Sequence, residues 1–173
     1  MKSSGIKTST VLASFLLAAC LSMHAEVKLP AIFSDGMVMQ QQTNANLWGT
    51  ATPNKKVTVT TGWNGKQYAV TADKNGSWKL SVSTPEAGGP YTITFDDGTP
   101  KTLNNILIGE LWLCSGQSNM EMPMKGFKNQ PVENANMDIL RSKNPHIRLF
   151  TVKRTSTITP QNDVVGSWKE AAP

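Results

Sequence analysis

The residues best suited to chemistry lie in one stretch, Leu111-Trp112-Leu113-Cys114-Ser115-Gly116-Gln117-Ser118-Asn119-Met120. An apolar segment ends here in a turn of small residues that carries a hydroxyl, and helix-compatible sequence follows from about Met120. We expect this arrangement to place Ser118 at the carboxyl end of a strand, beside the free N–H groups of the following segment. Such N–H groups can hold the negative oxygen of a tetrahedral intermediate, which makes Ser118 the candidate nucleophile.

A serine hydroxyl is a weak nucleophile at neutral pH and needs an adjacent base to take its proton. The sequence has two histidines, His24 and His146. His24 lies in a segment that we expect to be removed, and His146 has no aspartate in the spacing Asp-x-x-His. Neither histidine is therefore a good candidate for the base. The alternative role for Ser118 is to cap the end of a helix.

The composition argues against several other functions. The net charge is +5, but the basic residues are scattered and form no nucleic-acid surface. Outside the amino-terminal segment the only thiol is Cys114, so we expect no disulfide and no metal site. We expect Cys114 to be a small buried residue on the strand before the serine turn. Serine acyl transfer needs no organic cofactor.

Residues 1–25 have the layout of a secretory signal peptide. Lys2 and Lys7 precede the apolar stretch 11–21, which is too short to span a bilayer, and small residues follow. Cleavage after Ala25 would give a periplasmic or secreted protein without a membrane span. The alternative is a lipoprotein signal, in which Cys20 would be lipidated and become the new terminus.

Residues 26–105 are typical of a small antiparallel β-sandwich. The segment Lys56-Val57-Thr58-Val59-Thr60 alternates polar with apolar residues, and Asn75-Gly76 is a hairpin turn signal. About seven short strands with regular turn signals favour a sandwich. Four of the five tryptophans are either sugar-stacking platforms or, more commonly, buried aromatics: Trp48, Trp63, Trp78 and Trp112.

The pattern changes in residues 106–173. Ile106-Leu107-Ile108 and Leu111-Trp112-Leu113 are apolar on both faces, which predicts strands covered on both sides in an α/β sheet. The spacing further predicts a helix over Asn134–Arg141 and a strand over Ile147–Val152. We therefore expect a second domain that begins near residue 106.

Two stretches carry a resemblance to a known family. The first is Leu29-Pro30-Ala31-Ile32-Phe33-Ser34-Asp35-Gly36-Met37-Val38-Met39-Gln40-Gln41, and the second is Gly109-Glu110-Leu111-Trp112-Leu113-Cys114-Ser115-Gly116-Gln117-Ser118-Asn119-Met120-Glu121-Met122-Pro123-Met124. The second closely resembles the start of the catalytic domain in sialate O-acetylesterases, which are SGNH (GDSL-like) hydrolases. The first looks like the usual opening of the same proteins.

This resemblance implies a β-sandwich followed by the start of a flavodoxin-like, three-layer α/β hydrolase domain. It implies that Ser118 is the nucleophile and that O-acetyl esters of sialic acids are hydrolysed. Gly116, Gln117 and Asn119 either contribute to the oxyanion and substrate pocket or simply shape the turn. Gln117 stands where relatives named for a Gly-Asp-Ser-Leu motif have aspartate.

The family's Asp-x-x-His block, which supplies the base, has no match in residues 106–173. We therefore expect a fragment of a longer protein, with an incomplete hydrolase domain that is inactive alone. Two other functions stay open. One is an esterase acting on acetylxylan or another acetylated glycan, and the other is a non-catalytic sandwich that binds glycans or serves a structural role.

Overall fold

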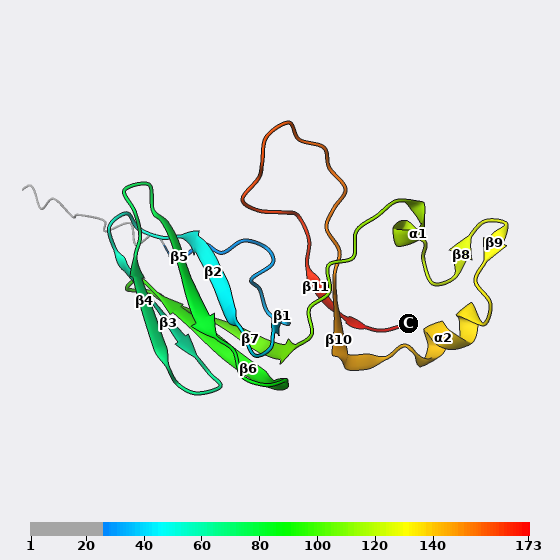
Figure 1. Ribbon diagram of the computed structural model, residues 1–173, viewed down its shortest axis with the longest axis horizontal. Helices are drawn as coiled ribbons and strands as arrows, with labels where there is room; N and C mark the ends of the chain where they lie inside the picture. Colours follow the sequence, from blue (N-terminus) through cyan, green and yellow to red (C-terminus); the bar gives the residue numbers. More distant parts are fainter. Residues whose placement is uncertain (1–25) are drawn as a thin grey trace, which may run out of the picture.

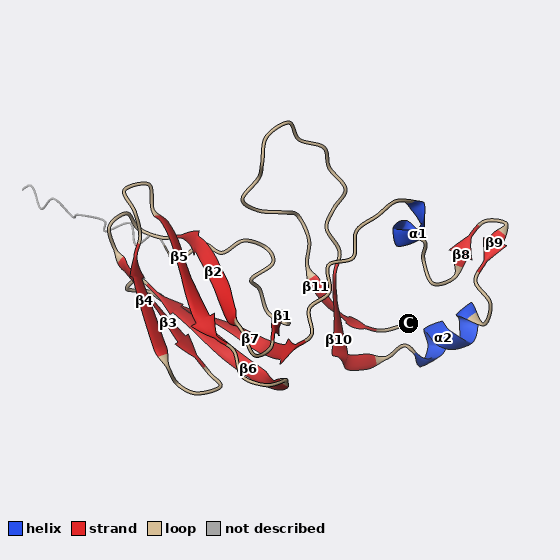
Figure 2. Cartoon of the chain, viewed as in Figure 1, coloured by secondary structure: helices blue, strands red, loops and turns tan. Residues whose placement is uncertain are grey.

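The computed structural model describes residues 26–173, so the expected signal peptide and Cys20 lie outside the described residues. Most of the regular structure is β (Figure 2), and it gathers at the amino-terminal end of this range. A body of packed strands comes first, and a thinner region of short elements and long loops follows it (Figure 1).

Seven strands form the body, and four further strands and two helices follow. The body contains β1 (Val38–Gln40), β2 (Asn44–Thr50), β3 (Lys56–Thr61), β4 (Gln67–Thr71), β5 (Ser77–Ser83), β6 (Gly88–Asp96) and β7 (Pro100–Gly109). The later elements are α1 (Ser118–Glu121), β8 (Gly126–Phe127), β9 (Gln130–Pro131), α2 (Ala135–Arg141), β10 (Asn144–Phe150) and β11 (Trp168–Ala171).

The strands of the body form two sheets. The larger has the order β1-β7-β6-β3-β4, and the smaller pairs β2 with β5. All pairings are antiparallel except β1 with β7, in which Val38 lies opposite Leu107 and Gln40 opposite Gly109. The larger sheet is therefore mixed, which differs from the purely antiparallel sandwich that we expected.

The core lies between these sheets and follows the alternation in the sequence. Val57 and Val59 of β3 are fully buried, while the residues between and beside them are more exposed. Val59 lies opposite Phe95 of β6, and Phe95 contacts Trp78 of β5 with ring centroids 5.9 Å apart. Leu47 of β2 adds a further buried side chain. Alternating side chains point to opposite faces of a strand, so Lys56, Thr58 and Thr60 of β3 lie outside the core, whereas Thr61 at the end of the same strand is fully buried.

The described residues do not show the α/β hydrolase domain that we expected from residue 106 onward. Ile106 and Ile108 are buried, but they belong to β7 and to the core of the body. Residues 111–113 form no strand, and Trp112 and Leu113 are 80% and 95% exposed. An apolar segment becomes a buried strand only when neighbouring strands and layers cover it, and residues 26–173 provide none there.

Two expectations for this region are confirmed. The helix predicted over Asn134–Arg141 is α2, and the strand predicted over Ile147–Val152 overlaps β10. β10 pairs with β11 across the long loop 151–167.

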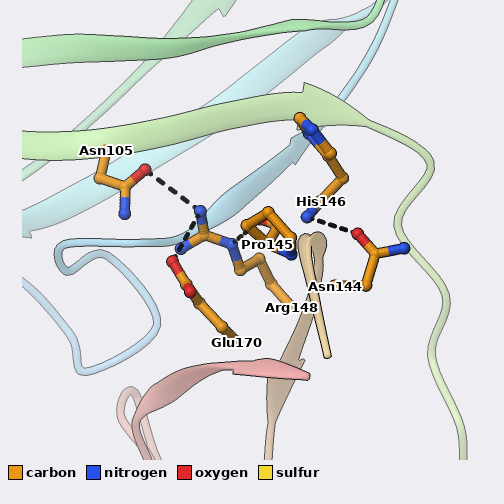
Figure 3. A network of polar contacts seen from close by, with 6 residues as sticks. All are labelled: Asn105, Asn144, Pro145, His146, Arg148 and Glu170. Carbon is orange, nitrogen blue, oxygen red and sulfur yellow. Dashed lines mark hydrogen bonds and ion pairs between the residues drawn. The ribbon is translucent and has the colours of Figure 1, made fainter. Parts of the chain in front are cut away.

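The β10–β11 hairpin is joined to the body through Arg148, whose side chain is only 5% exposed. Figure 3 shows its guanidinium between Asn105 of β7 and Glu170 of β11. It donates to the Asn105 Oδ1 atom at 3.1 Å and to the Pro145 carbonyl at 2.8 Å, and it lies 3.3 Å from a Glu170 carboxylate oxygen. A Cβ atom at Gly36, whose φ is +78°, would stand 3.2 Å from the same guanidinium, so a glycine there leaves it room.

Two further hydrogen bonds tie the carboxyl-terminal part to the body. The Trp168 indole N–H donates to the Ile32 carbonyl at 2.8 Å, and the Ala31 N–H donates to the Asp163 carboxylate at 2.8 Å. The Trp168 ring also contacts Phe150 of β10, with centroids 5.3 Å apart. The segment around residues 31–36 is therefore the surface on which the hairpin and its loop are held.

Candidate functional site

Ser118 is the first residue of α1, a helix of a single turn. Gln117 precedes it with non-helical backbone angles, and the Gln117 carbonyl accepts a hydrogen bond from the Met120 N–H at 2.9 Å. Ser118 is exposed, and within residues 26–173 neither its hydroxyl nor its N–H has a hydrogen-bond partner. The hydroxyl is therefore accessible, and its own N–H is free to face a ligand oxygen.

The turn before the helix is tight. A Cβ atom at Gly116 would lie 2.6 Å from the Met120 Cγ atom, so the absence of a side chain lets Met120 fold back against the turn. Gln117 and Asn119 flank the serine and are exposed. The candidate site residues Gly116, Gln117, Ser118 and Asn119 thus lie together on one exposed turn, as consecutive residues must.

An ion pair connects this turn to a distant segment. The Glu121 carboxylate lies 2.9 Å from the Arg154 guanidinium, which belongs to the long loop after β10. Both side chains are largely exposed, so the pair contributes at most about 1 kcal/mol. It links α1 to that loop on the surface of the molecule.

A second contact, which the sequence pattern did not predict, holds the start of the segment that leads to Ser118. The Glu110 carboxylate accepts hydrogen bonds from the side-chain amides of Gln40 at 3.1 Å and Gln41 at 2.6 Å. The Gln40 side chain also accepts a hydrogen bond from the Leu111 N–H at 2.9 Å. These bonds lower the pKa of Glu110 from its ordinary value, and the bond from Gln41 has the larger effect. The sequence offered one clue, because Gln40, Gln41 and Glu110 all lie in the two stretches that carry the resemblance.

The described residues do not complete a catalytic triad. His146 is exposed in β10, its backbone N–H donates to the Asn144 side chain at 2.9 Å (Figure 3), and no hydrogen bond joins its imidazole to Ser118. Within residues 26–173, no three His, Cys, Asp or Glu side chains come close enough together to hold a metal ion.

Cys114 differs from our expectation. It is exposed and lies in the irregular segment before α1, not on a buried strand. The reason is the same as for Leu113, since no neighbouring layer in the described part of the chain covers this segment. As for membrane spans, neither helix within residues 26–173 has the length and apolar character that crossing a bilayer requires.

The chain is similar to several known proteins, although no protein-family model matches it. It is 33% identical to sialate O-acetylesterase from Mus musculus over 150 residues, which are 79% of this chain and 27% of that protein. It is 28% identical to the sialate O-acetylesterase from Homo sapiens over 148 residues, which are 80% of this chain and 28% of that protein.

A solved structure agrees with these sequence relatives. The crystal structure of a carbohydrate acetylesterase from Xanthomonas citri superimposes with a TM-score of 0.77 at 30% sequence identity. The match covers 85% of this chain and 33% of that one, and the chain spans between a quarter and a third of the length of the relatives it matches. Over about four fifths of its length, the chain is therefore a distant homologue of the sialate O-acetylesterases and resembles a carbohydrate acetylesterase in structure.

Proposed function

We propose that the chain is part of an exported esterase that removes acetyl groups from O-acetylated sialic acids, with Ser118 as its nucleophile. The observation that carries this proposal is the position of Ser118. It lies in the longest stretch of family resemblance and heads a helical turn, with an exposed hydroxyl and a free N–H.

In this proposal the Ser118 Oγ atom attacks the acetyl carbonyl and its proton passes to a general base. The tetrahedral intermediate carries a negative oxygen, which the Ser118 N–H helps to stabilise, and its collapse expels the sugar alcohol. Water then cleaves the acetyl-enzyme and releases acetate. Gly116 keeps the turn tight, and Gln117 and Asn119 flank the acyl group. The base belongs to an Asp-x-x-His block outside the 173 residues.

The exposure of large apolar side chains supports the proposal that a further layer of hydrolase structure covers residues 111–165. Several of them are exposed in the described chain: Leu111, Trp112, Leu113, Met120, Met124, Leu140, Leu149 and Val165. Such a number of large apolar side chains exposed within one segment is typical of a region that another part of the protein or a partner covers. In the proposed enzyme, the rest of the hydrolase domain covers these side chains and brings the base to Ser118.

The test is acetate release from O-acetylated sialic acid by the full-length gene product. Ser118→Ala should lower kcat/KM by at least about a thousandfold without changing thermal stability, because the hydroxyl has no partner in the described residues. Ser115→Ala is the matched control, since Ser115 is an exposed serine in the same turn. Retained activity in Ser118→Ala would exclude it as the nucleophile.

The sugar that bears the acetyl group is a separate question. The serine turn contacts the acetyl group and does not specify the rest of the substrate, so an acetylxylan or other glycan acetylesterase is the alternative. Parallel assays on acetylxylan and on O-acetyl sialic acid decide between them. Glycan binding by the complete protein without any acetate release would instead favour a non-catalytic sandwich, which the absence of a triad from residues 26–173 also allows.

Export rests on the sequence of residues 1–25, and we propose a periplasmic or secreted location. Metabolic labelling with a fatty acid separates the two forms of the protein. Label that is lost in Cys20→Ser would indicate a lipoprotein, whereas an unlabelled protein that begins at Glu26 would indicate cleavage after Ala25.

A further inference from the structure

A hollow of about 530 Å³ lies on the outer face of the β2–β5 sheet, away from Ser118 in the chain and not used by the proposed reaction. Lys28, Trp48 and Lys79 line it from the body, and Asn162 and Asp163 line it from the long loop between β10 and β11. The hollow is therefore formed where that loop meets the body.

Trp48 is the aromatic wall of the hollow. It is half-buried, and the ring of Phe33 packs against it edge to face, with centroids 4.5 Å apart and planes at 75°. This contact restricts the orientations that the indole can take. A ring restricted in this way offers an apolar face to the C–H side of a pyranose. It also loses little side-chain entropy when a sugar binds, because the packing of Phe33 already limits its motion.

Two lysines give the hollow a positive charge. Lys79 lies directly opposite Trp48 in the β2–β5 pairing, and Lys28 bridges to Thr50 at the end of β2. Both lysines are exposed, and neither forms an ion pair within residues 26–173. Their ammonium groups are therefore available to an anionic ligand.

The acidic residue of the hollow has a different role. One oxygen of the Asp163 carboxylate accepts hydrogen bonds from the backbone N–H groups of Ala31 at 2.8 Å and Val164 at 2.7 Å. Asp163 thus fastens the loop to the body and leaves the hollow with two positive charges against one negative. The neighbouring Asn162 side chain is exposed and can donate or accept hydrogen bonds with sugar hydroxyls.

We propose that this hollow is a second glycan-binding site, specific for an acidic sugar. The pyranose ring packs on Trp48, its carboxylate pairs with Lys28 and Lys79, and its hydroxyls bond to Asn162. A neutral sugar would use the ring and the amide but would leave both ammonium groups unpaired. The site requires no bond to be made or broken, and it does not depend on whether Ser118 is a nucleophile.

The test is an NMR titration of the full chain with 3′-sialyllactose and, separately, with lactose. The two ligands differ only in the acidic sugar, and neither carries an O-acetyl ester, so failure of the esterase proposal leaves the outcome unaffected. We expect 3′-sialyllactose to shift the Trp48 indole N–H and the Lys79 amide at about millimolar concentrations, with little effect of lactose. The shifts should weaken as salt is added, because exposed charges are screened.

Variants locate the site. Lys79→Gln should weaken binding of 3′-sialyllactose by about threefold, the loss expected for one exposed charge pair. Trp48→Ala should abolish the shift of the Lys79 amide. Trp48→Phe should keep part of the affinity, and it replaces the alanine variant if thermal unfolding shows that Trp48→Ala is unstable. Lys56→Gln is the control, because Lys56 is an exposed lysine of β3 that does not line the hollow. Equal binding of lactose, no binding of either sugar, or unchanged affinity in Lys79→Gln and Trp48→Phe would each overturn the proposal.

Discussion

Arg148→Met tests how the carboxyl-terminal hairpin is held on the β body. The methionine keeps much of the apolar stem, so the change mainly removes the guanidinium. In the native chain this group bonds to the Pro145 carbonyl and the Asn105 side chain and pairs with Glu170, while only 5% of the arginine side chain is exposed. The three partners come from β7, β10 and β11, so one group connects three strands.

The expected loss follows from the exposure of each partner. A hydrogen bond to a charged group contributes about 1.5–3 kcal/mol, but the side chains of Asn105 and Glu170 can turn to water when the arginine is removed. Glu170 is 51% exposed, so its share is that of a surface pair, at most about 1 kcal/mol. We therefore expect Arg148→Met to lower the free energy of unfolding by about 2–4 kcal/mol, with most of the loss from the bond to the Pro145 carbonyl, which cannot turn away to water as the two side chains can.

The assay is urea unfolding followed by tryptophan fluorescence. Arg154→Met is the matched control, because it makes the same substitution at an arginine that also forms an ion pair. Arg154 lies 2.9 Å from Glu121, but its side chain is 86% exposed. It should change stability by less than about 0.5 kcal/mol. Glu170→Gln should cost less than about 1 kcal/mol. If Arg148→Met is as stable as Arg154→Met, the assignment of Arg148 as the junction is wrong.

Two further predictions concern the body. The pKa of Glu110 should rise in Gln41→Ala, because the largest hydrogen bond that lowers it is removed, and carboxyl NMR titration measures this. A carboxylate whose pKa is lower in the folded state than in the unfolded state stabilises the fold at pH values above its unfolded pKa. This stabilisation is lost as the pH falls through the folded-state pKa. The variant lacks part of it and should therefore lose less stability on acidification. Gly49→Ala should destabilise the chain by about 1–3 kcal/mol, since its Cβ would lie 2.4 Å from the Lys28 carbonyl oxygen; unchanged thermal stability would contradict this.

Local patterns were sufficient to predict several strands of the body, although they assigned the end of β7 to a second domain. The alternation around Val57 and Val59 and the turn at Asn75-Gly76 correspond to β3 and to the β4–β5 connection. The pairing of β1 with β7 was not predictable in the same way. Its parallel direction depends on residues far apart in the sequence, and period-two alternation is the same in parallel and antiparallel strands.

The region around Ser118 shows the opposite case. Leu111-Trp112-Leu113 has the pattern of a strand buried on both faces, yet the described residues leave it exposed and irregular. The apolar pattern shows that a segment can be buried, but burial also needs neighbouring strands or helices that cover it. The local pattern does not show whether residues 26–173 contain those elements. Arg148 was missed for a related reason, because a charged residue in a strand is usually solvated and only the fold shows that this arginine side chain is buried among its partners.

The two stretches that carry the resemblance form one physical unit, although many residues separate them. The first supplies β1, which pairs with β7 up to Gly109, and it supplies Gln40 and Gln41, which bind Glu110 at the start of the second stretch. The same Gln40 accepts the Leu111 N–H, so the direction in which the chain leaves the body is set by side chains of the opening segment. The second stretch alone would contain the serine turn without the side chains that fix the start of its segment on the body. The presence of both stretches is what connects the orientation of the Ser118 segment to the β body.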